Sequence, residues 1–253
     1  MALYSICFSP TGGTQKVLQI LQNAWDTPAQ EIDLTVPGAD YASYHFSHTD
    51  MCLIAVPSFG GRVPSVALER LRLMHADRTP TVFIAVYGNR AIDDTLLELQ
   101  RELRPNGFEA CAAISAVAEH SIMHQFGTGR PDSTDAIQLH QFAVKIQQAL
   151  SKPDRSVPTL PGHFPYLPHH AASMHPAANE HCIQCGLCAQ RCPVSAIPIN
   201  APNQTDPARC IGCMRCTVIC PMSARAVDSA ALSALIQRLE PACSGRKENC
   251  LYL

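Results

Sequence analysis

Residues 182–193 read CIQCGLCAQRCP, and residues 210–221 read CIGCMRCTVICP. Both stretches follow one pattern: three cysteines with two residues between neighbours, a fourth cysteine after three more residues, and then a proline. A tight loop with this spacing can present three thiolates to one inorganic cluster, and the fourth ligand must come from elsewhere. The eight cysteines are Cys182, Cys185, Cys188, Cys192, Cys210, Cys213, Cys216 and Cys220. They predict a cluster-binding segment around which the rest of the chain is arranged.

This doubled run resembles the bacterial ferredoxins that carry two 4Fe-4S clusters. The resemblance implies that the fourth cysteine of each run crosses to the other cluster. One cluster would be held by Cys182, Cys185, Cys188 and Cys220, and the other by Cys210, Cys213, Cys216 and Cys192. Structural zinc usually takes two pairs of ligands across a longer gap, and disulfide scaffolds are typical of short secreted chains. Both alternatives fit these triplets less well than two clusters do.

Length and composition predict a globular protein of two domains. The 253 residues exceed the usual domain size of about 100–150 residues. Hydrophobic residues make up 47% and charged residues 16%, and no apolar run approaches the roughly 20 residues of a membrane helix. The net charge of −2 and the lack of a basic stripe argue against nucleic-acid binding. The first residues lack the pattern of a secretory signal, so the expected location is the cytoplasm.

The first 150 residues alternate strand-like and helix-like segments. Apolar strand-like runs lie at 2–8, 29–34, 50–56, 80–86 and 108–118, and apolar residues with helical spacing follow them. This alternation predicts a doubly wound parallel sheet with right-handed crossovers. Together with an anion-binding loop after the first strand, it predicts the strand order 2-1-3-4-5. The expected fold of residues 1–150 is therefore α/β, and it resembles the flavodoxin fold.

A loop of small and hydroxyl-bearing residues joins the first strand to the first helix. Backbone N–H groups at a helix N-terminus bind anions, and the loop resembles the phosphate loop of flavodoxins, which holds FMN without a basic residue. An ordinary turn with a threonine cap is the alternative. The resemblance implies that the FMN phosphate contacts Ser9, Thr11, Gly12, Gly13 and Thr14.

Three more loops lie at the carboxyl ends of strands, where parallel sheets bind ligands. Those after the third and fourth strands are expected to hold the flavin ring through Pro57, Ser58, Phe59, Gly60, Gly61, Tyr87, Gly88 and Asn89. Arg62 and Arg90 close these loops, and a guanidinium beside the ring would favour an anionic reduced flavin. Solvated loop charges are the alternative for both arginines. After the fifth strand, His120 and Ser121 are candidates for a proton donor or substrate anchor, or for a structural hydrogen bond.

The remaining chain divides into a connector and a cysteine-rich part. Residues 151–180 are rich in proline and without periodicity, which predicts a semi-rigid connector with solvated histidines. Residues 181–253 are the expected α+β two-cluster ferredoxin domain, including a helix that ends at Pro241 and a tail whose position stays open. Cysteines in apolar runs are predicted core residues, namely Cys7, Cys52 and Cys111. Two cysteines stay unassigned, namely Cys243 and Cys250.

The order of a flavodoxin-like domain, a connector and a two-cluster ferredoxin resembles the flavodoxin–ferredoxin fusion family, often labelled ferrodoxin. The resemblance implies an FMN- and 4Fe-4S-dependent oxidoreductase: an external low-potential donor reduces the clusters, and FMN passes electrons to a small-molecule acceptor. The alternatives are a fused electron carrier without a substrate of its own and a redox sensor. An open pocket over the flavin favours the enzyme, and an exposed flavin edge favours the carrier. A homodimer is a further expectation, because flavodoxin-like reductases often complete their site across a dimer.

Overall fold

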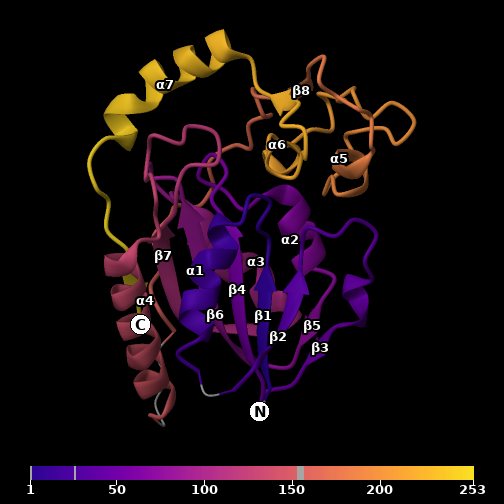
Figure 1. Ribbon diagram of the computed structural model, residues 1–253. Coiled ribbons are helices and arrows are strands. Elements are labelled where there is room, and N and C mark those ends of the chain that lie inside the picture. Colours follow the sequence, from indigo (N-terminus) through magenta and orange to yellow (C-terminus); the bar gives the residue numbers. More distant parts are fainter. Residues whose placement is uncertain (1, 26, 153–156) are drawn as a thin grey trace.

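A six-stranded sheet forms the centre of the computed structural model, which describes residues 2–25, 27–152 and 157–253 (Figure 1). Five of its strands are parallel: β1 (Leu3–Cys7), β2 (Ala29–Asp33), β4 (Met51–Pro57), β6 (Thr79–Tyr87) and β7 (Phe108–Val117). The full order is β2-β1-β4-β6-β7-β10. Counted along the chain, the five parallel strands have the order 2-1-3-4-5, which is the flavodoxin-like order. The fold predicted from the sequence is therefore confirmed, with a sixth strand added.

Helices cover both faces of this sheet. On one face lie α1 (Gly13–Gln22) and α4 (Ser133–Leu150), and on the other lie α2 (Ser65–Leu71) and α3 (Thr95–Leu103). In strand β4 all residues from Met51 to Val56 are buried. A parallel strand covered on both sides needs such a continuous apolar run.

The crossover from β2 to β4 is irregular. The chain there forms a 3-10 turn, η1 (Tyr41–Ser43), and a short strand, β3 (His45–Phe46), that pairs with β5 (His75–Ala76). A second 3-10 turn, η2 (Arg104–Asn106), joins α3 to β7. Since β5 precedes β6 and η2 precedes β7 in the chain, both lie at the amino ends of those strands.

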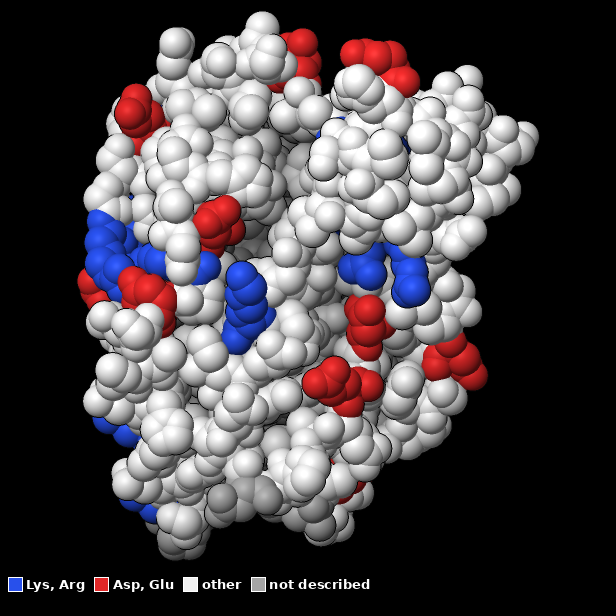
Figure 2. All heavy atoms as spheres, in the orientation of Figure 1, with Lys and Arg blue, Asp and Glu red and all other residues white. Residues whose placement is uncertain are grey.

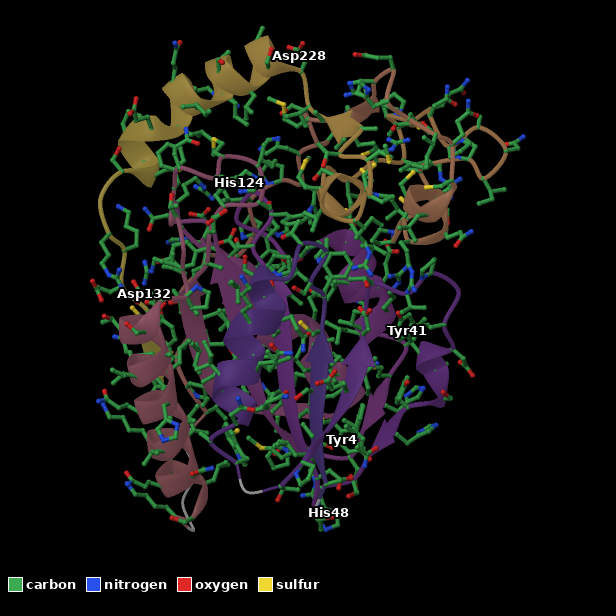
Figure 3. The ribbon with its side chains drawn as sticks, in the orientation of Figure 1. Tyr4, Tyr41, His48, His124, Asp132 and Asp228 are labelled. Atoms are coloured by element: carbon green, nitrogen blue, oxygen red, sulfur yellow. The ribbon has the colours of Figure 1, made fainter. Side chains whose placement is uncertain are left out.

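The cysteine-rich part sits above the carboxyl ends of the strands (Figure 1). It contains two short helices, α5 (Leu187–Gln190) and α6 (Arg215–Val218), and an antiparallel pair of β8 (Ala177–Ala178) and β9 (Arg225–Ala226). Figure 3 shows sulfur atoms gathered around α5 and α6. In Figure 2 the cysteine-rich part, at the upper right, shows few charged side chains. The surface is hollowed between this part and the region of α7 at the upper left.

The C-terminal segment returns to the first domain. Helix α7 (Ser229–Cys243) begins at Asp228, whose carboxylate accepts the N–H of Ala231 at 2.7 Å, and it includes Pro241 instead of ending there. Its apolar side packs on Met123 and Phe126 in the loop after β7. Pro241 has no N–H to donate to the carbonyl four residues earlier, and the helix ends two residues after it.

The tail then forms β10 (Cys250–Tyr252), which pairs antiparallel with β7. The sequence division grouped this tail with the ferredoxin part, and the structure corrects it by placing the tail on the flavodoxin-like sheet. Asn249 fixes the strand: its side chain accepts the N–H of Val117 at 2.9 Å and donates to Asp135 at 2.9 Å.

The connector is held firmly where the structure describes it; residues 153–156 lie outside the described part. The buried carboxylate of Asp94 accepts the N–H groups of His163 at 2.8 Å and Leu167 at 2.7 Å. A side-chain amide, from Gln100, donates to the carbonyl of Pro158 at 3.2 Å. The expected semi-rigid spacer is therefore docked along α3, and it continues from there over the edge of the sheet.

Candidate functional site

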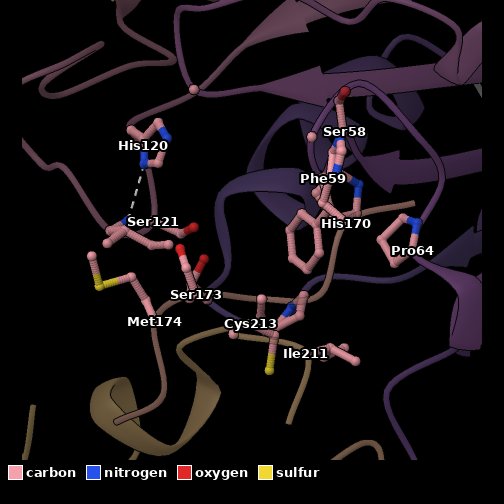
Figure 4. A pocket seen from close by; sticks show the side chains of 18 of the residues that line it. Ser58, Phe59, Pro64, His120, Ser121, His170, Ser173, Met174, Ile211 and Cys213 are labelled. Atoms are coloured by element: carbon pink, nitrogen blue, oxygen red, sulfur yellow. Dashed lines mark hydrogen bonds between the residues drawn. The ribbon is translucent and has the colours of Figure 1, made fainter. Parts of the chain in front are cut away.

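A cavity of about 690 Å³ lies at the carboxyl ends of β1, β4, β6 and β7. Its floor is made by the loops that follow these four strands, and its roof by the connector, the second cysteine loop and α7. Figure 4 shows this convergence, with Phe59, His120 and His170 drawn around one space together with Cys213. The volume falls in the usual range of about 300–1,000 Å³ for small-molecule and cofactor sites.

The loop between β1 and α1 forms one edge of the cavity. Thr11, Gly13 and Thr14 line the cavity, and the hydroxyls of both threonines bond to no other residue in the described part of the chain. Gly12 has a φ of 93°, a left-handed conformation that glycine adopts without strain, and it precedes the first turn of the helix. Ser9 stands behind the wall, where its hydroxyl accepts the N–H of Gln15 at 2.9 Å.

The loop after β4 turns back sharply beneath the cavity. Phe59 and Arg62 exchange two backbone hydrogen bonds, of 2.9 and 3.1 Å, around Gly60 and Gly61, whose φ values are 60° and 86°. Both glycines are needed because such a turn requires a positive φ at each central position. A Cβ on Gly61 would also lie 2.2 Å from the carboxylate of Asp93. The turn presents Phe59 and Gly60 to the cavity together with two preceding residues, Pro57 and Ser58.

Tyr87, Gly88 and His120 form the next part of the wall. Gly88 allows the imidazole to lie against the backbone, since a Cβ there would be 2.6 Å from Cδ2 of His120. Nδ1 of His120 accepts the N–H groups of Ile122 and Met123, both at 3.1 Å. This pairing assigns the neutral tautomer that carries its proton on Nε2.

Burial lowers the pKa of His120 to about 4, and nearby positive charge on His124 and Arg90 acts in the same direction. The imidazole is therefore neutral near pH 7. His120 can donate a hydrogen bond through Nε2, but it does not carry an extra proton to give away. Of the functions expected from the sequence, His120 therefore keeps that of a hydrogen-bond donor and not that of a proton donor. Ser121 lines the cavity beside His120.

Arg62 does not line the cavity, contrary to the sequence-based expectation. Its side chain is 10% exposed and makes two hydrogen bonds to Glu98, of 2.9 and 2.6 Å, while Glu98 is 1% exposed. It also donates to the carbonyl of Leu167 and stacks over the ring of Tyr166, 4.7 Å from its centre. Arg62 therefore anchors the connector to α3, and its charge is already balanced.

Arg90 and Asn89 also point elsewhere. Arg90 pairs with Asp93 and lines a separate open groove beside the connector and β10. Asn89 is buried and donates to the carbonyls of Cys243 and Gly245, at 2.6 and 2.7 Å. Its function is to hold the link between α7 and β10. Neither residue is positioned to touch a ligand in the main cavity.

The roof of the cavity was not foreseen from the sequence. It comprises residues 168–174 of the connector, residues 207–213 before and within the second cysteine run, and two leucines of α7. His169 and His170, expected to be solvated linker residues, are exposed, and they also lie on this roof. Their irregular spacing gave no signal, because they reach the site through the docking of the connector. The roof also brings Cys210 and Cys213 to the cavity wall.

The cysteines of the two runs are shared between two small cavities. The first is lined by the triplet of the first run and the last cysteine of the second, namely Cys182, Cys185, Cys188 and Cys220. The second is lined by the triplet of the second run and the last cysteine of the first, namely Cys210, Cys213, Cys216 and Cys192. These are the two sets that crossed ligation requires, so the donor chemistry fits two 4Fe-4S clusters.

The cysteine cavities differ from a single-ion site. Among the described residues, no three His, Cys, Asp or Glu side chains stand close enough to hold one metal ion. A cubane is bound by one thiolate at each iron, so its ligands stand further apart than those around one ion. Burial raises the pKa of Cys213 to about 12 and that of Cys216 to about 11, so these thiols keep their protons until iron replaces them.

Comparison with known proteins identifies the cysteine-rich part. Residues 179–197 and 204–226 each match a family described as a 4Fe-4S binding domain. No curated protein matches the chain. In the described part of the chain, no helix has both the length and the apolar character needed to cross a membrane.

Solved structures resemble the first domain. A flavodoxin from Streptococcus pneumoniae TIGR4 is 18% identical over 58% of this chain and 99% of its own, with a TM-score of 0.41. Flavodoxin 2 from Bacillus cereus is 11% identical over 58% and 99%, with a TM-score of 0.44. An FMN-dependent NADH-azoreductase from Bacillus anthracis, solved with FMN, is 12% identical over 60% and 100%, with a TM-score of 0.38. The strand order described above and the two family matches together give a flavodoxin-like α/β domain followed by 4Fe-4S binding domains.

Proposed function

We propose that this chain, a flavodoxin-like domain joined to 4Fe-4S binding domains, is an iron–sulfur flavoprotein oxidoreductase. In this proposal FMN occupies the main cavity, two clusters deliver electrons to it, and a small acceptor is reduced there. The observation that carries the proposal is that Cys210 and Cys213 stand in the wall of the same cavity as the anion-binding loop. Flavin is the cofactor that couples the one-electron chemistry of clusters to two-electron reduction.

The phosphate of FMN would lie at the N-terminus of α1. Donors for an anion come from the hydroxyls of Thr11 and Thr14, which bond to no other described residue, and from the N–H groups of the first helical turn. That turn contains no acidic residue. This helix end suits the one terminal phosphate of FMN. The isoalloxazine ring would lie toward Phe59, Tyr87 and His120.

His120 and the roof would prepare the site for an acceptor. His120 presents a fixed N–H, because Nδ1 is occupied by backbone donors. The connector and α7 form one side of the cavity, opposite the strand loops. A carrier needs only an exposed flavin edge, whereas this roofed cavity has room beside a flavin for a small molecule. An open cavity of this size favours the enzyme over the fused carrier.

The positions of the two cysteine sets suggest an order for the electrons. The set containing Cys210 and Cys213 adjoins the main cavity, so its cluster would reduce the flavin. The set containing Cys185 does not line that cavity, and Cys185 is exposed. The first cluster would accept electrons from an external donor and pass them to the second.

FMN titration of the anaerobically purified holoprotein, after removal of its flavin, tests the proposed site. Thr14→Val should weaken FMN binding roughly 5- to 150-fold, since losing a buried donor to a phosphate costs about 1–3 kcal/mol. Thr134→Val is the matched control, because Thr134 stands exposed in the first turn of α4. Equal affinities of Thr14→Val and the wild type, or binding of FAD in preference to FMN, would contradict the proposal.

A further inference from the structure

Arg225 is a buried cation beside the first cysteine cavity. Only 4% of the residue is exposed, and it lines the cavity of Cys182, Cys185, Cys188 and Cys220. A guanidinium stays protonated inside proteins. Burying such a charge is costly unless negative charge lies nearby.

No carboxylate balances Arg225 within the described chain. Its terminal nitrogens donate to uncharged oxygens: the hydroxyl of Thr205 at 2.8 Å, the carbonyls of Gln204 at 3.0 Å and Pro176 at 3.2 Å, and the carbonyl of Pro202. Its Nε is buried and has no hydrogen-bond partner. One donor and one full positive charge are therefore left to be satisfied at the cavity wall.

The internal repeat places an uncharged residue at the position that corresponds to Arg225. After its last cysteine, the first run continues Pro193-Val194-Ser195-Ala196-Ile197, and the second continues Pro221-Met222-Ser223-Ala224-Arg225. The two serines share a left-handed backbone, with φ values of 51° and 48°, so the two turns correspond. Ile197 lines the second cavity as Arg225 lines the first, and it is buried to the same degree. An isoleucine fills the equivalent position without introducing charge.

We propose that Arg225 is the counter-charge of the cluster held by Cys182, Cys185, Cys188 and Cys220. Four thiolates make an oxidised 4Fe-4S centre negative, and uptake of one electron from the donor makes it more negative by one charge. Arg225 stabilises the reduced state more than the oxidised state, so it raises the reduction potential of the first cluster. The second cavity has Ile197 in the equivalent position, and the arginine that lines it, Arg215, comes instead from the start of α6. The inference rests on the cluster assignment in the proposed function, but on neither the flavin nor the acceptor.

An anchoring function would also explain the hydrogen bonds of Arg225 to the loop between the two runs. The two explanations differ in what they need. The counter-charge needs a positive charge, while an anchor needs the branched donors of arginine. Lysine keeps the charge and loses the branched geometry, whereas glutamine keeps donors and loses the charge.

Redox titration of the anaerobic holoprotein, followed by EPR, separates these explanations. Arg225→Gln should lower the reduction potential of the first cluster by at least about 59 mV. For one electron this shift equals a tenfold change in the equilibrium constant of reduction. Arg225→Lys should stay close to the wild type, and so should Arg238→Gln, which removes an exposed charge from α7. Cys185→Ser identifies the signal of the first cluster. Unchanged potentials in Arg225→Gln, or equal shifts in the lysine and glutamine variants, would overturn the proposal.

A second measurement applies if the variants lose their clusters. Wild-type protein labelled with ¹⁵N-arginine should show a hyperfine coupling between an arginine nitrogen and the reduced first cluster. The absence of any such coupling would overturn the proposal without a variant. Both measurements read the clusters themselves, so a failure of the flavin site would not change their outcome.

Discussion

Arg62→Leu removes one half of a buried ion pair and leaves the other half behind. Glu98 is 1% exposed and binds Arg62 through hydrogen bonds of 2.9 and 2.6 Å. It also accepts the N–H of Val63 at 2.9 Å, so it cannot turn to solvent without losing another bond. We expect the substitution to lower the free energy of unfolding by about 3–5 kcal/mol, the usual cost of leaving a buried charge unpaired.

The magnitude follows from the geometry of the pair. Two unit charges about 3 Å apart attract each other by roughly 5 kcal/mol at an effective dielectric constant of about 20. Desolvation of both ions offsets much of this attraction in the wild type. The double variant Arg62→Leu/Glu98→Gln should therefore recover most of the lost stability. It leaves no charge unpaired, and the amide oxygen of the introduced glutamine can still accept the N–H of Val63.

Denaturant unfolding of the anaerobic holoprotein measures these differences. The pair of Arg72 and Glu102 is the matched control, since it also joins the α2 region to α3 but has side chains 47% and 28% exposed. Arg72→Leu should cost less than about 1 kcal/mol. The reasoning fails if Arg62→Leu lowers the free energy of unfolding no more than Arg72→Leu does. It also fails if the double variant is less stable than Arg62→Leu. If Arg62→Leu lowered the flavin potential and left the stability unchanged, the result would support the sequence-based expectation that Arg62 lies beside the flavin ring.

Three further predictions concern the tail, the cavity and the clusters. Asn249→Ala should cost about 1–3 kcal/mol and speed amide hydrogen exchange at Val117, its backbone partner; unchanged exchange would contradict this. The pKa of His120 is lowered to about 4 in the folded protein, so stability should fall by up to about 3 kcal/mol as the pH falls from about 6.5 to 4. His120→Asn should lose this slope and the exposed-site control His48→Asn should keep it; identical slopes in the two variants would refute the assignment. Cys192→Ala should alter the EPR signal of the cluster bound by the second triplet, and a change confined to the first cluster would rule out crossed ligation.

The sequence predicts the sheet well because its signals are local. Each parallel strand is an apolar run, and each is followed by a helical spacing of apolar residues, so the alternation gives the doubly wound fold directly. The runs at 50–56 and 108–118, for example, correspond to β4 and β7 within one or two residues. The cysteine spacing is local as well, and the residues of each set line one cavity.

The sequence fails where a position depends on distant partners. Arg62 follows a glycine turn at the carboxyl ends of the strands, as predicted. The direction of its side chain, however, is set by Glu98 on α3, 36 residues away. The tail is too short to show strand periodicity, and its place depends on Asn249 reaching Val117. The sequence did contain one signal of this ion pair. Glu98 is a charged residue among the leucines of α3, between Leu96 and Leu99.

Flash reduction of the anaerobic, flavin-loaded holoprotein tests the central claim most directly. A photochemical reductant delivers one electron, and absorbance follows the clusters and the flavin together. Because Cys210 and Cys213 stand in the wall of the proposed flavin cavity, we expect the clusters to be reoxidised and the flavin reduced with one first-order rate constant that does not depend on protein concentration. A rate that rises in proportion to protein concentration, or a flavin that stays oxidised while the clusters hold the electron, would contradict the account.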